Sequence, residues 1–229
     1  MAGFITRLKT STQQFFGRVT DKFKKIAVSV KRWHERYKER RRKAKTIRET
    51  RRSTPEYKPE VVDTEIKTQL ADKLNQINEG HVVEHIRALP LEDRKEFFEE
   101  TIVPLVASTM NADIKAIEWF DCNTSCAIGQ YCDTDQSIWL NIEYLSENDE
   151  YLLRHMVNTV IHECKHALQN DAARGRNTHG YSQELIVAWY RNINDYITPE
   201  EDLEAYVKQP IEWDARCFAE SVFPTDIND

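Results

Sequence analysis

The stretch VIHECKHALQ, residues 160–169, decides how this chain is expected to fold and what the fold can hold. It places His162 and His166 four residues apart around Glu163, in the pattern HExxH. Apolar residues recur on both sides at helical spacing, and together with a capping signal they predict a helix over residues 146–170. Residues four apart lie one turn above each other, so both imidazoles leave the same side of this helix.

Two imidazoles on one helical face predict a metal site. Zn²⁺ suits such nitrogens, and with three protein ligands it keeps an open position for water. The bound metal lowers the pKa of that water to about 7, and Glu163 is placed to take its proton. The sequence therefore predicts a zinc-dependent hydrolase with His162 and His166 as ligands and Glu163 as catalytic base.

The third ligand decides the class of site. A metzincin needs glycine and histidine three and six residues after the second histidine, and Gln169 and Ala172 exclude it. A carboxylate from a later helix is the alternative. We expect Glu212, because small alanines follow it on the same side and permit a close helix contact. Asp214, which points about 200° around that helix, and Glu184 are the remaining choices.

The rest of the chain alternates between helical and strand patterns, which predicts an α+β fold. A hairpin turn is expected at residues 133–136, between the second and third strands, and Pro104 is expected to kink its helix. Strands are predicted at residues 114–120, 127–132 and 137–142, and further helices near residues 66–77 and at 91–110, 183–196, 199–207 and 210–222. We expect a small antiparallel sheet packed on the HExxH helix.

Charge divides the chain into two parts. Residues 1–53 hold 18 Lys and Arg against 4 Asp and Glu, although the whole chain has a net charge of −6. Their apolar residues recur three and four apart, which predicts a long basic amphipathic helix. A linker is expected at residues 54–61, followed by a domain at 62–229 whose core covers about 114–222.

The basic helix indicates several kinds of partner. Such a helix is suited to binding an anionic membrane surface, nucleic acid or the chain's own acidic domain. Its first part also has the pattern of a mitochondrial presequence. With no run of about 18 apolar residues and no secretory signal, we expect a cytoplasmic protein that could lie peripherally at a membrane. Five cysteines are too few for a disulfide framework, and Cys122, Cys126 and Cys132 lack the spacing of a structural zinc site.

The order of these motifs resembles a known group. Strands containing GQY and IWLN, then HExxHALQ, then ExxAxxFA, are similar to minimal gluzincin-type peptidases, including ImmA/IrrE-type domains, over residues 114–222. ImmA/IrrE-type domains usually have glycine where this chain has Lys165, so the resemblance is to the wider group. It implies a zincin-like endopeptidase for protein or peptide substrates, with His162, His166 and Glu212 as ligands. It also implies that an extended substrate pairs with an edge strand, expected at residues 137–142.

The donor that stabilises the transition state is the open part of the prediction. Gluzincins supply a tyrosine or histidine to the developing oxyanion, and His179, Tyr181 and Tyr206 are the candidates. Two other functions compete with the peptidase. One is a catalytically silent zincin-fold binding protein, and the other is a membrane- or nucleic-acid-targeted adaptor in which HExxH is accidental.

Overall fold

The computed structural model describes residues 38, 42, 60–121 and 127–225. The chain divides into two units, Met1–Glu49 and Thr50–Asp229. Of the predicted basic helix, only Lys38 and Arg42 are described, and both are helical and exposed. The rest of that prediction, the linker up to residue 59, and two of the three clustered cysteines lie outside the described residues. The second unit contains the HExxH motif and the described strands.

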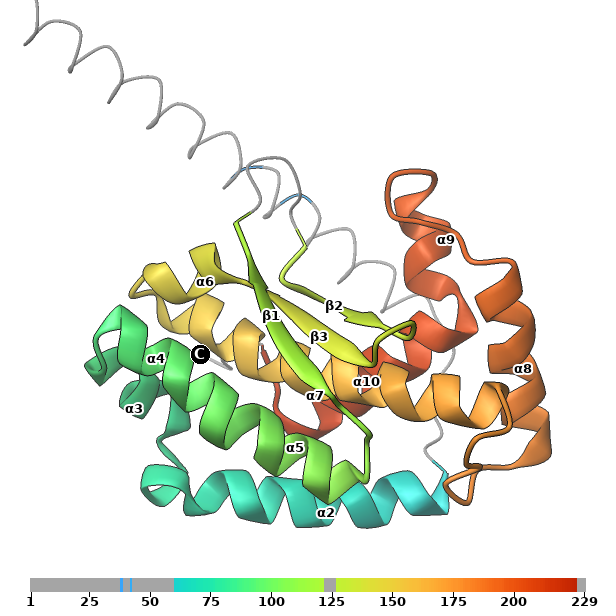
Figure 1. Ribbon diagram of the computed structural model, residues 1–229, viewed down its shortest axis with the longest axis horizontal. Coiled ribbons are helices and arrows are strands. Elements are labelled where there is room, and N and C mark those ends of the chain that lie inside the picture. Colours follow the sequence, from blue (N-terminus) through green and yellow to red (C-terminus); the bar gives the residue numbers. More distant parts are fainter. Residues whose placement is uncertain (1–37, 39–41, 43–59, 122–126, 226–229) are drawn as a thin grey trace, which may run out of the picture. The chain divides into compact units, whose positions relative to one another are not determined.

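A three-stranded sheet forms one layer of this unit (Figure 1). Its strands are β1 (Ala116–Phe120), β2 (Gly129–Cys132) and β3 (Ser137–Asn141), in the order β1-β3-β2. The predicted strands and the hairpin turn at residues 133–136 are confirmed. The fully antiparallel sheet was wrong, because β1 runs parallel to β3 while β2 runs antiparallel to it. Alternating burial identifies a strand but is the same for either direction of its neighbour.

The prediction that residues 137–142 form an edge strand was also wrong. β3 lies between β1 and β2, so its backbone groups pair on both sides. Ile138 and Leu140 are fully buried, whereas Trp139 between them is partly exposed on the other face. The central strand is also the most buried of the three, with four of its five residues buried. The strand edge that packs along the motif helix belongs to β2.

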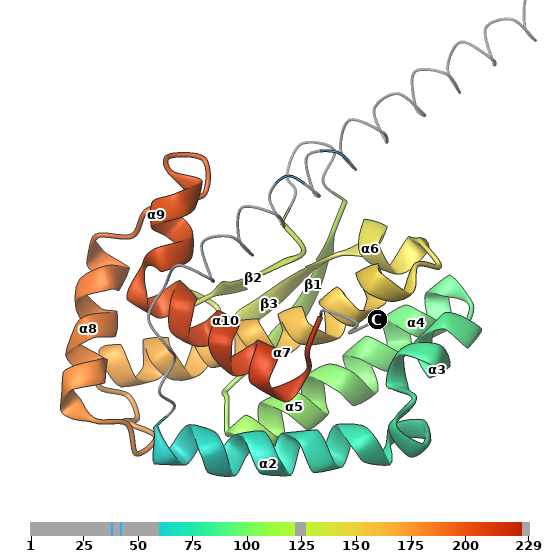
Figure 2. The ribbon, with the colours of Figure 1, turned by 180° about the vertical axis from the view of Figure 1, so that it is seen from behind.

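The HExxH motif lies on α7 (Glu150–Ala173). The helix starts later than predicted, since Asp149 is the N-cap and its side chain accepts from the backbone N–H of Leu152. Ser146 instead ends the short helix α6 (Ile142–Ser146). The sheet lies on one side of α7, and α10 (Pro210–Val222) lies on the other (Figures 1 and 2).

The other helices surround this arrangement. They are α2 (Val61–Gln76), α3 (Val82–Ala88), α4 (Leu91–Phe97), α5 (Val103–Met110), α8 (Gln183–Asn194) and α9 (Leu203–Lys208). The predicted helix at residues 91–110 is interrupted by a π-helical turn, Phe98–Ile102, in which the Val103 N–H bonds the carbonyl of Phe98. Pro104 lies two residues after the end of this turn and has no N–H to donate, so the irregular turn comes where the regular ladder would be broken.

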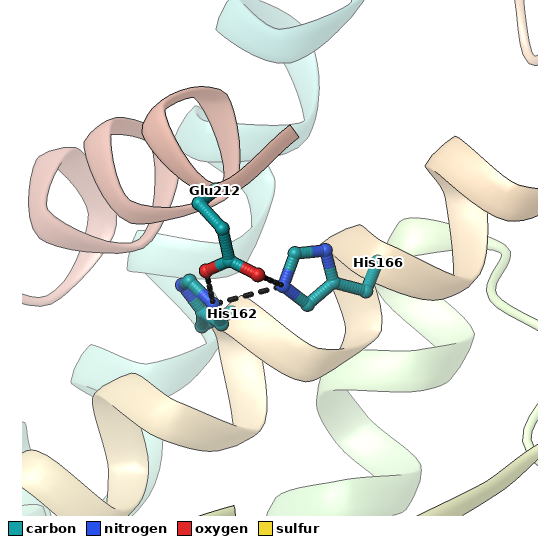
Figure 3. Close-up of side chains that lie close together, drawn as sticks. All are labelled: His162, His166 and Glu212. Atoms are coloured by element: carbon teal, nitrogen blue, oxygen red, sulfur yellow. Dashed lines mark hydrogen bonds and ion pairs between the residues drawn. The ribbon is translucent and has the colours of Figure 1, made fainter. Parts of the chain in front are cut away.

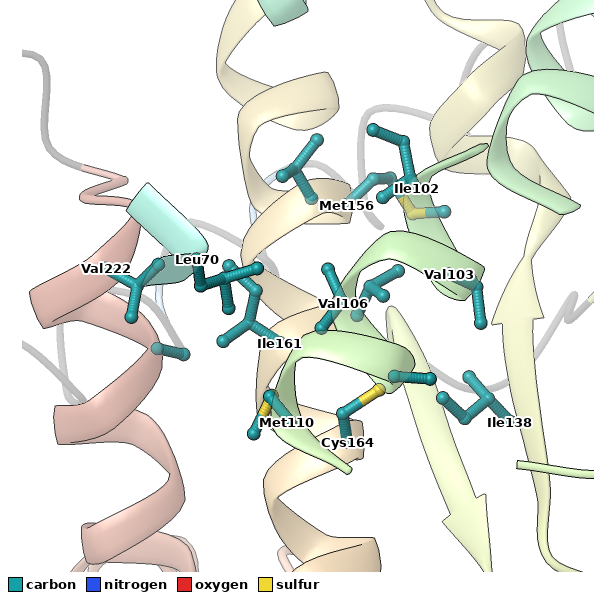
Figure 4. Packing of buried hydrophobic residues seen from close by; sticks show 14 of the residues in the cluster. Leu70, Ile102, Val103, Val106, Met110, Ile138, Met156, Ile161, Cys164 and Val222 are labelled. Atoms are coloured by element: carbon teal, nitrogen blue, oxygen red, sulfur yellow. The ribbon is translucent and has the colours of Figure 1, made fainter. Parts of the chain in front are cut away.

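The core forms around α7. Residues of α2, α5, α7, α10 and β3 pack together there (Figure 4), among them Leu70, Val106, Ile138, Ile161 and Val222. Cys164, inside the motif, is fully buried, and burial raises the pKa of its thiol. Packing on several sides fixes the rotation of α7 and therefore the directions of its polar side chains. Among the described residues, no helix is both long and apolar enough to cross a membrane.

Candidate metal centre

Three side chains from two helices converge at one point (Figure 3). His162 and His166 project from α7 with their Nε2 atoms 3.0 Å apart. Glu212, in the first turn of α10, places Oε1 3.3 Å from His166 Nε2 and Oε2 3.4 Å from His162 Nε2. These ligand atoms all lie within 4.8 Å of one another. No other such group of three occurs in the part of the chain that the structure describes.

Local sequence explains how Glu212 reaches the two histidines. Pro210 opens α10 at a position where a missing N–H costs nothing. Ala215 and Ala219, three and seven residues after Glu212, are fully buried. Small side chains on this side allow α10 to approach α7 closely, and those two helices are in contact.

Glu212 and His166 each favour the charged form of the other. Burial alone would raise the pKa of Glu212, but His166 and His162 hold it well below its usual range. Burial alone would lower the pKa of His166, yet Glu212 and its hydrogen bond raise it to about 9. In the metal-free protein, a proton on His166 therefore neutralises the buried carboxylate. A metal cation would take the place of that proton.

One oxygen of the carboxylate lacks a hydrogen bond. Glu212 Oε2 is buried, and no donor among the described residues hydrogen-bonds it. Its ion-pair partners, His162 and Arg216, lie 3.4 and 3.8 Å away. Buried carboxylate oxygens are normally hydrogen-bonded or bound to a metal. Glu212 Oε2 and the Nε2 atoms of His162 and His166 are therefore a suitable set of atoms to bind a metal ion.

Glu163 follows His162 in the chain and lies close enough to His162, His166 and Glu212 for their charges to shift its pKa. It is buried, and its Oε2 accepts a hydrogen bond of 2.8 Å from the backbone N–H of Tyr131 on β2. Burial raises the pKa of Glu163, and the charge of Glu212 raises it further, although both histidines oppose the shift. The sheet edge thus orients a carboxylate whose proton affinity is above that of an exposed glutamate.

Two tyrosines lie close to Glu212. The Tyr196 hydroxyl donates to Glu212 Oε1 at 2.6 Å, and its ring meets that of Tyr206 edge-on at 6.2 Å. Burial, followed by the charge of Glu212, raises the pKa of both hydroxyls. Tyr206 was among the predicted donors, whereas Tyr196 was not named in the sequence-based prediction. It lies in the loop between α8 and α9, where no spacing or motif distinguishes it from other surface tyrosines.

The other two predicted donors make different contacts. His179 places Nε2 3.3 Å from Asp171 Oδ2, and its backbone has a φ of +52°. The Tyr181 hydroxyl lies 2.8 Å from both Lys165 Nζ and Asp63 Oδ1. Neither side chain belongs to the group that converges on the metal position.

The alternative ligands also lie elsewhere. Asp214 accepts a hydrogen bond of 2.7 Å from Gln169 Nε2 and is not in the converging group. Glu184 is exposed on α8. Comparison with known proteins adds no relative: no protein-family model, no curated protein and no solved structure matches this chain. A proposal for function therefore rests on the chemistry of the site.

Proposed function

We propose that this protein is a zincin-like, zinc-dependent peptidase that hydrolyses peptide bonds in a protein or peptide substrate. His162, His166 and Glu212 would hold the ion, and Glu163 would act as general base. The observation that supports this most directly is the convergence of a buried carboxylate, 46 residues from the second histidine, on an HExxH pair.

The donor set favours zinc over the harder cations. Ca²⁺ and Mg²⁺ are bound by oxygen ligands, whereas this group offers two imidazole nitrogens and one carboxylate. Two histidines and one glutamate form a known ligand set of catalytic zinc, with a further position left for water or substrate. Because the group contains no thiolate, it is unlike the closed sites of structural zinc.

Proton transfer is the task of Glu163. A bound zinc ion supplies Lewis acidity, which activates water at neutral pH and polarises a carbonyl. Glu163 takes the proton of the attacking water and returns it to the amine nitrogen that leaves. Burial raises its pKa in the metal-free protein, which makes this carboxylate a stronger base than an exposed glutamate. The Tyr131 N–H keeps the carboxylate oriented during both transfers.

Tyr196 is the best placed donor for the oxyanion. Its hydroxyl donates a hydrogen bond to the proposed ligand Glu212. Because 42% of the residue is exposed, a substrate could reach it. Tyr206 is more deeply buried, and its ring packs edge-on against that of Tyr196. An extended substrate would pair with the outer edge of β2, which has no strand partner among the described residues, instead of with residues 137–142, because β3 is paired on both sides.

A paired measurement tests this function. Zinc content and cleavage of an unstructured protein such as casein are compared for the wild type, Glu163→Gln, and the matched control Glu184→Gln on the exposed side of α8. We expect about one zinc per chain in all three, with cleavage at least about 100-fold slower only in Glu163→Gln.

The outcomes separate the competing functions. Well-folded protein without zinc would refute the metal site and favour the adaptor. Zinc without cleavage that depends on Glu163 would favour a catalytically silent binding protein. Equal cleavage by all three proteins would mean that a contaminant is responsible.

A further inference from the structure

A buried cation lies next to the second histidine in the sequence. Lys165 is fully buried, and its Nζ lies 2.5 Å from Asp63 Oδ1 on α2 and 3.5 Å from Asp214 Oδ2 on α10. Three rings surround the ammonium group, with centroids 4.3 Å (Tyr181), 4.9 Å (Phe218) and 5.5 Å (Trp189) away. Acids from two helices and three aromatic faces thus enclose one charge.

The burial of Lys165 with two acids points to a role beyond stabilising the fold. Burying a charge is costly, and replacing a whole buried ion pair by apolar residues of similar volume often gives an equally stable fold. The acids involved are themselves buried, at 1% exposure for Asp63 and 6% for Asp214. Asp214 connects this cluster to the metal centre.

The connection passes through an amide. Gln169 Nε2 donates to Asp214 Oδ2 at 2.7 Å and to the backbone carbonyl of Ile211 at 3.0 Å. An amide nitrogen can only donate, and an ionised carboxylate and a carbonyl can only accept. With the carboxylate beside Lys165, the orientation of the Gln169 amide is therefore set by its partners.

The oxygen of the Gln169 amide faces His166, one of the proposed metal ligands. Gln169 Oε1 lies 2.7 Å from His166 Nδ1. Because this oxygen only accepts, Nδ1 must carry a proton. In a neutral imidazole the lone pair then belongs to Nε2, the atom that faces His162 and Glu212.

We infer that Lys165 is a positioning residue of the metal centre: through Asp214 and Gln169 it holds His166 in the orientation and tautomer that present Nε2 to the ion. The inference rests on the proposed function, since it needs a metal at this site. A metal-binding histidine more usually donates directly to a carboxylate or a backbone carbonyl. Here His166 donates to the Gln169 amide, whose orientation depends on Asp214 and Lys165. The inference also assigns a role to the residue at which this chain departs from the glycine of ImmA/IrrE-type domains.

A purely structural role for the cluster makes a different prediction. The salt bridge from Lys165 to Asp63 ties α2 to α7 but does not lead to His166. Asp63→Asn is therefore a matched control, because it weakens the buried cluster and leaves the path through Asp214 intact. If the cluster only stabilises the fold, metal affinity will follow stability in every variant.

The test compares zinc affinity and thermal unfolding in full-length protein. Zn²⁺ binding is measured by competition with a chromophoric chelator for the wild type, Gln169→Met, Asp214→Asn, Asp63→Asn and the double variant Lys165→Met/Asp63→Asn. We expect affinity to fall about 10- to 100-fold for Gln169→Met and Asp214→Asn, and about tenfold for the double variant. Asp63→Asn should melt at a lower temperature with affinity within about threefold of wild type.

A second measurement uses only the wild-type protein, so it does not depend on whether the variants fold. In zinc-loaded wild-type protein labelled with ¹⁵N-histidine, the Nδ1–H proton of His166, held by Gln169 Oε1, should exchange slowly with water. Wild type that binds no Zn²⁺ refutes the proposed function. Wild type that binds Zn²⁺ but shows a rapidly exchanging His166 Nδ1–H overturns the relay alone, as does equal affinity in Gln169→Met and wild type.

Discussion

Replacing Lys165 by methionine should destabilise the metal-free protein far more than the loss of an ordinary ion pair. Methionine keeps most of the apolar stem, but the contacts of the ammonium group with the rings of Tyr181, Trp189 and Phe218 are lost. The ammonium group is lost, which leaves Asp63 buried without the cation that now lies 2.5 Å away. Removing one partner of a buried pair costs about 3–5 kcal/mol.

The expected change is large enough to measure by thermal or urea unfolding. For a unit of this size, each kcal/mol moves the melting temperature by about 2–4 °C, so the midpoint should fall by roughly 6–20 °C. Lys208→Met is the matched control, because its salt bridge to Glu204 has the same length of 2.5 Å but joins side chains that are 44% and 65% exposed. That variant should lose no more than about 0.5 kcal/mol.

A second substitution tests whether the buried charge is responsible. Asp63→Asn alone removes charge-assisted hydrogen bonds and should cost about 1–3 kcal/mol. In the Lys165→Met protein the same change removes an uncompensated charge, so it should be neutral or stabilising. The coupling between the two sites should be about 1 kcal/mol or more. If the two losses simply add, or if Lys165→Met unfolds within about 1 kcal/mol of wild type, the buried charge is not what holds this region together.

Four further predictions concern the site and the basic segment. Glu212→Gln should weaken Zn²⁺ binding by more than about 100-fold in chelator competition, and unchanged affinity would eliminate Glu212 as a ligand. Because the pKa of His166 is raised from 6.5 to about 9 in the folded metal-free protein, its pairing with Glu212 stabilises the fold fully below pH 6.5, and this contribution is lost as the pH rises through 9. Melting curves in EDTA from pH 6 to 10 should show this decline, and Glu212→Gln should lack it. Tyr196→Phe should lower kcat by about 100-fold while zinc content stays the same, and an unchanged kcat would leave Tyr206 as the donor to examine. Residues 1–53 should bind anionic vesicles at low salt and release them at high salt, whereas tighter binding to DNA would favour the nucleic-acid alternative.

Much of the fold is set by local pattern. The period of 3.6 residues in an α-helix puts His162 and His166 on one side of α7 whatever else the chain does. Alternation located the three strands, and the helices near the C-terminus were predicted close to their observed bounds. These features depend on residues a few positions apart, where backbone geometry alone relates one side chain to the next.

Strand order and direction were beyond local pattern. The sequence indicates that Ser137–Asn141 is apolar enough to be buried, but not that Ala116–Phe120 pairs with it in parallel and occupies its other side. The same limit explains the error over the edge strand. Pairing is decided by how a long connection returns the chain to the sheet, and short-range alternation carries no information about that path.

The site divides in the same way. HExxH by itself determined a pair of imidazoles and an adjacent carboxylate, and the motif needs only one helix. Whether Glu212 or Asp214 faces that pair, whether Tyr196 reaches it, and whether Lys165 is solvated or enclosed with Asp63 depended on the tertiary structure. Those relations join residues on helices and loops that are distant in the chain, and their directions are set only when packing fixes the rotation of each element about its axis.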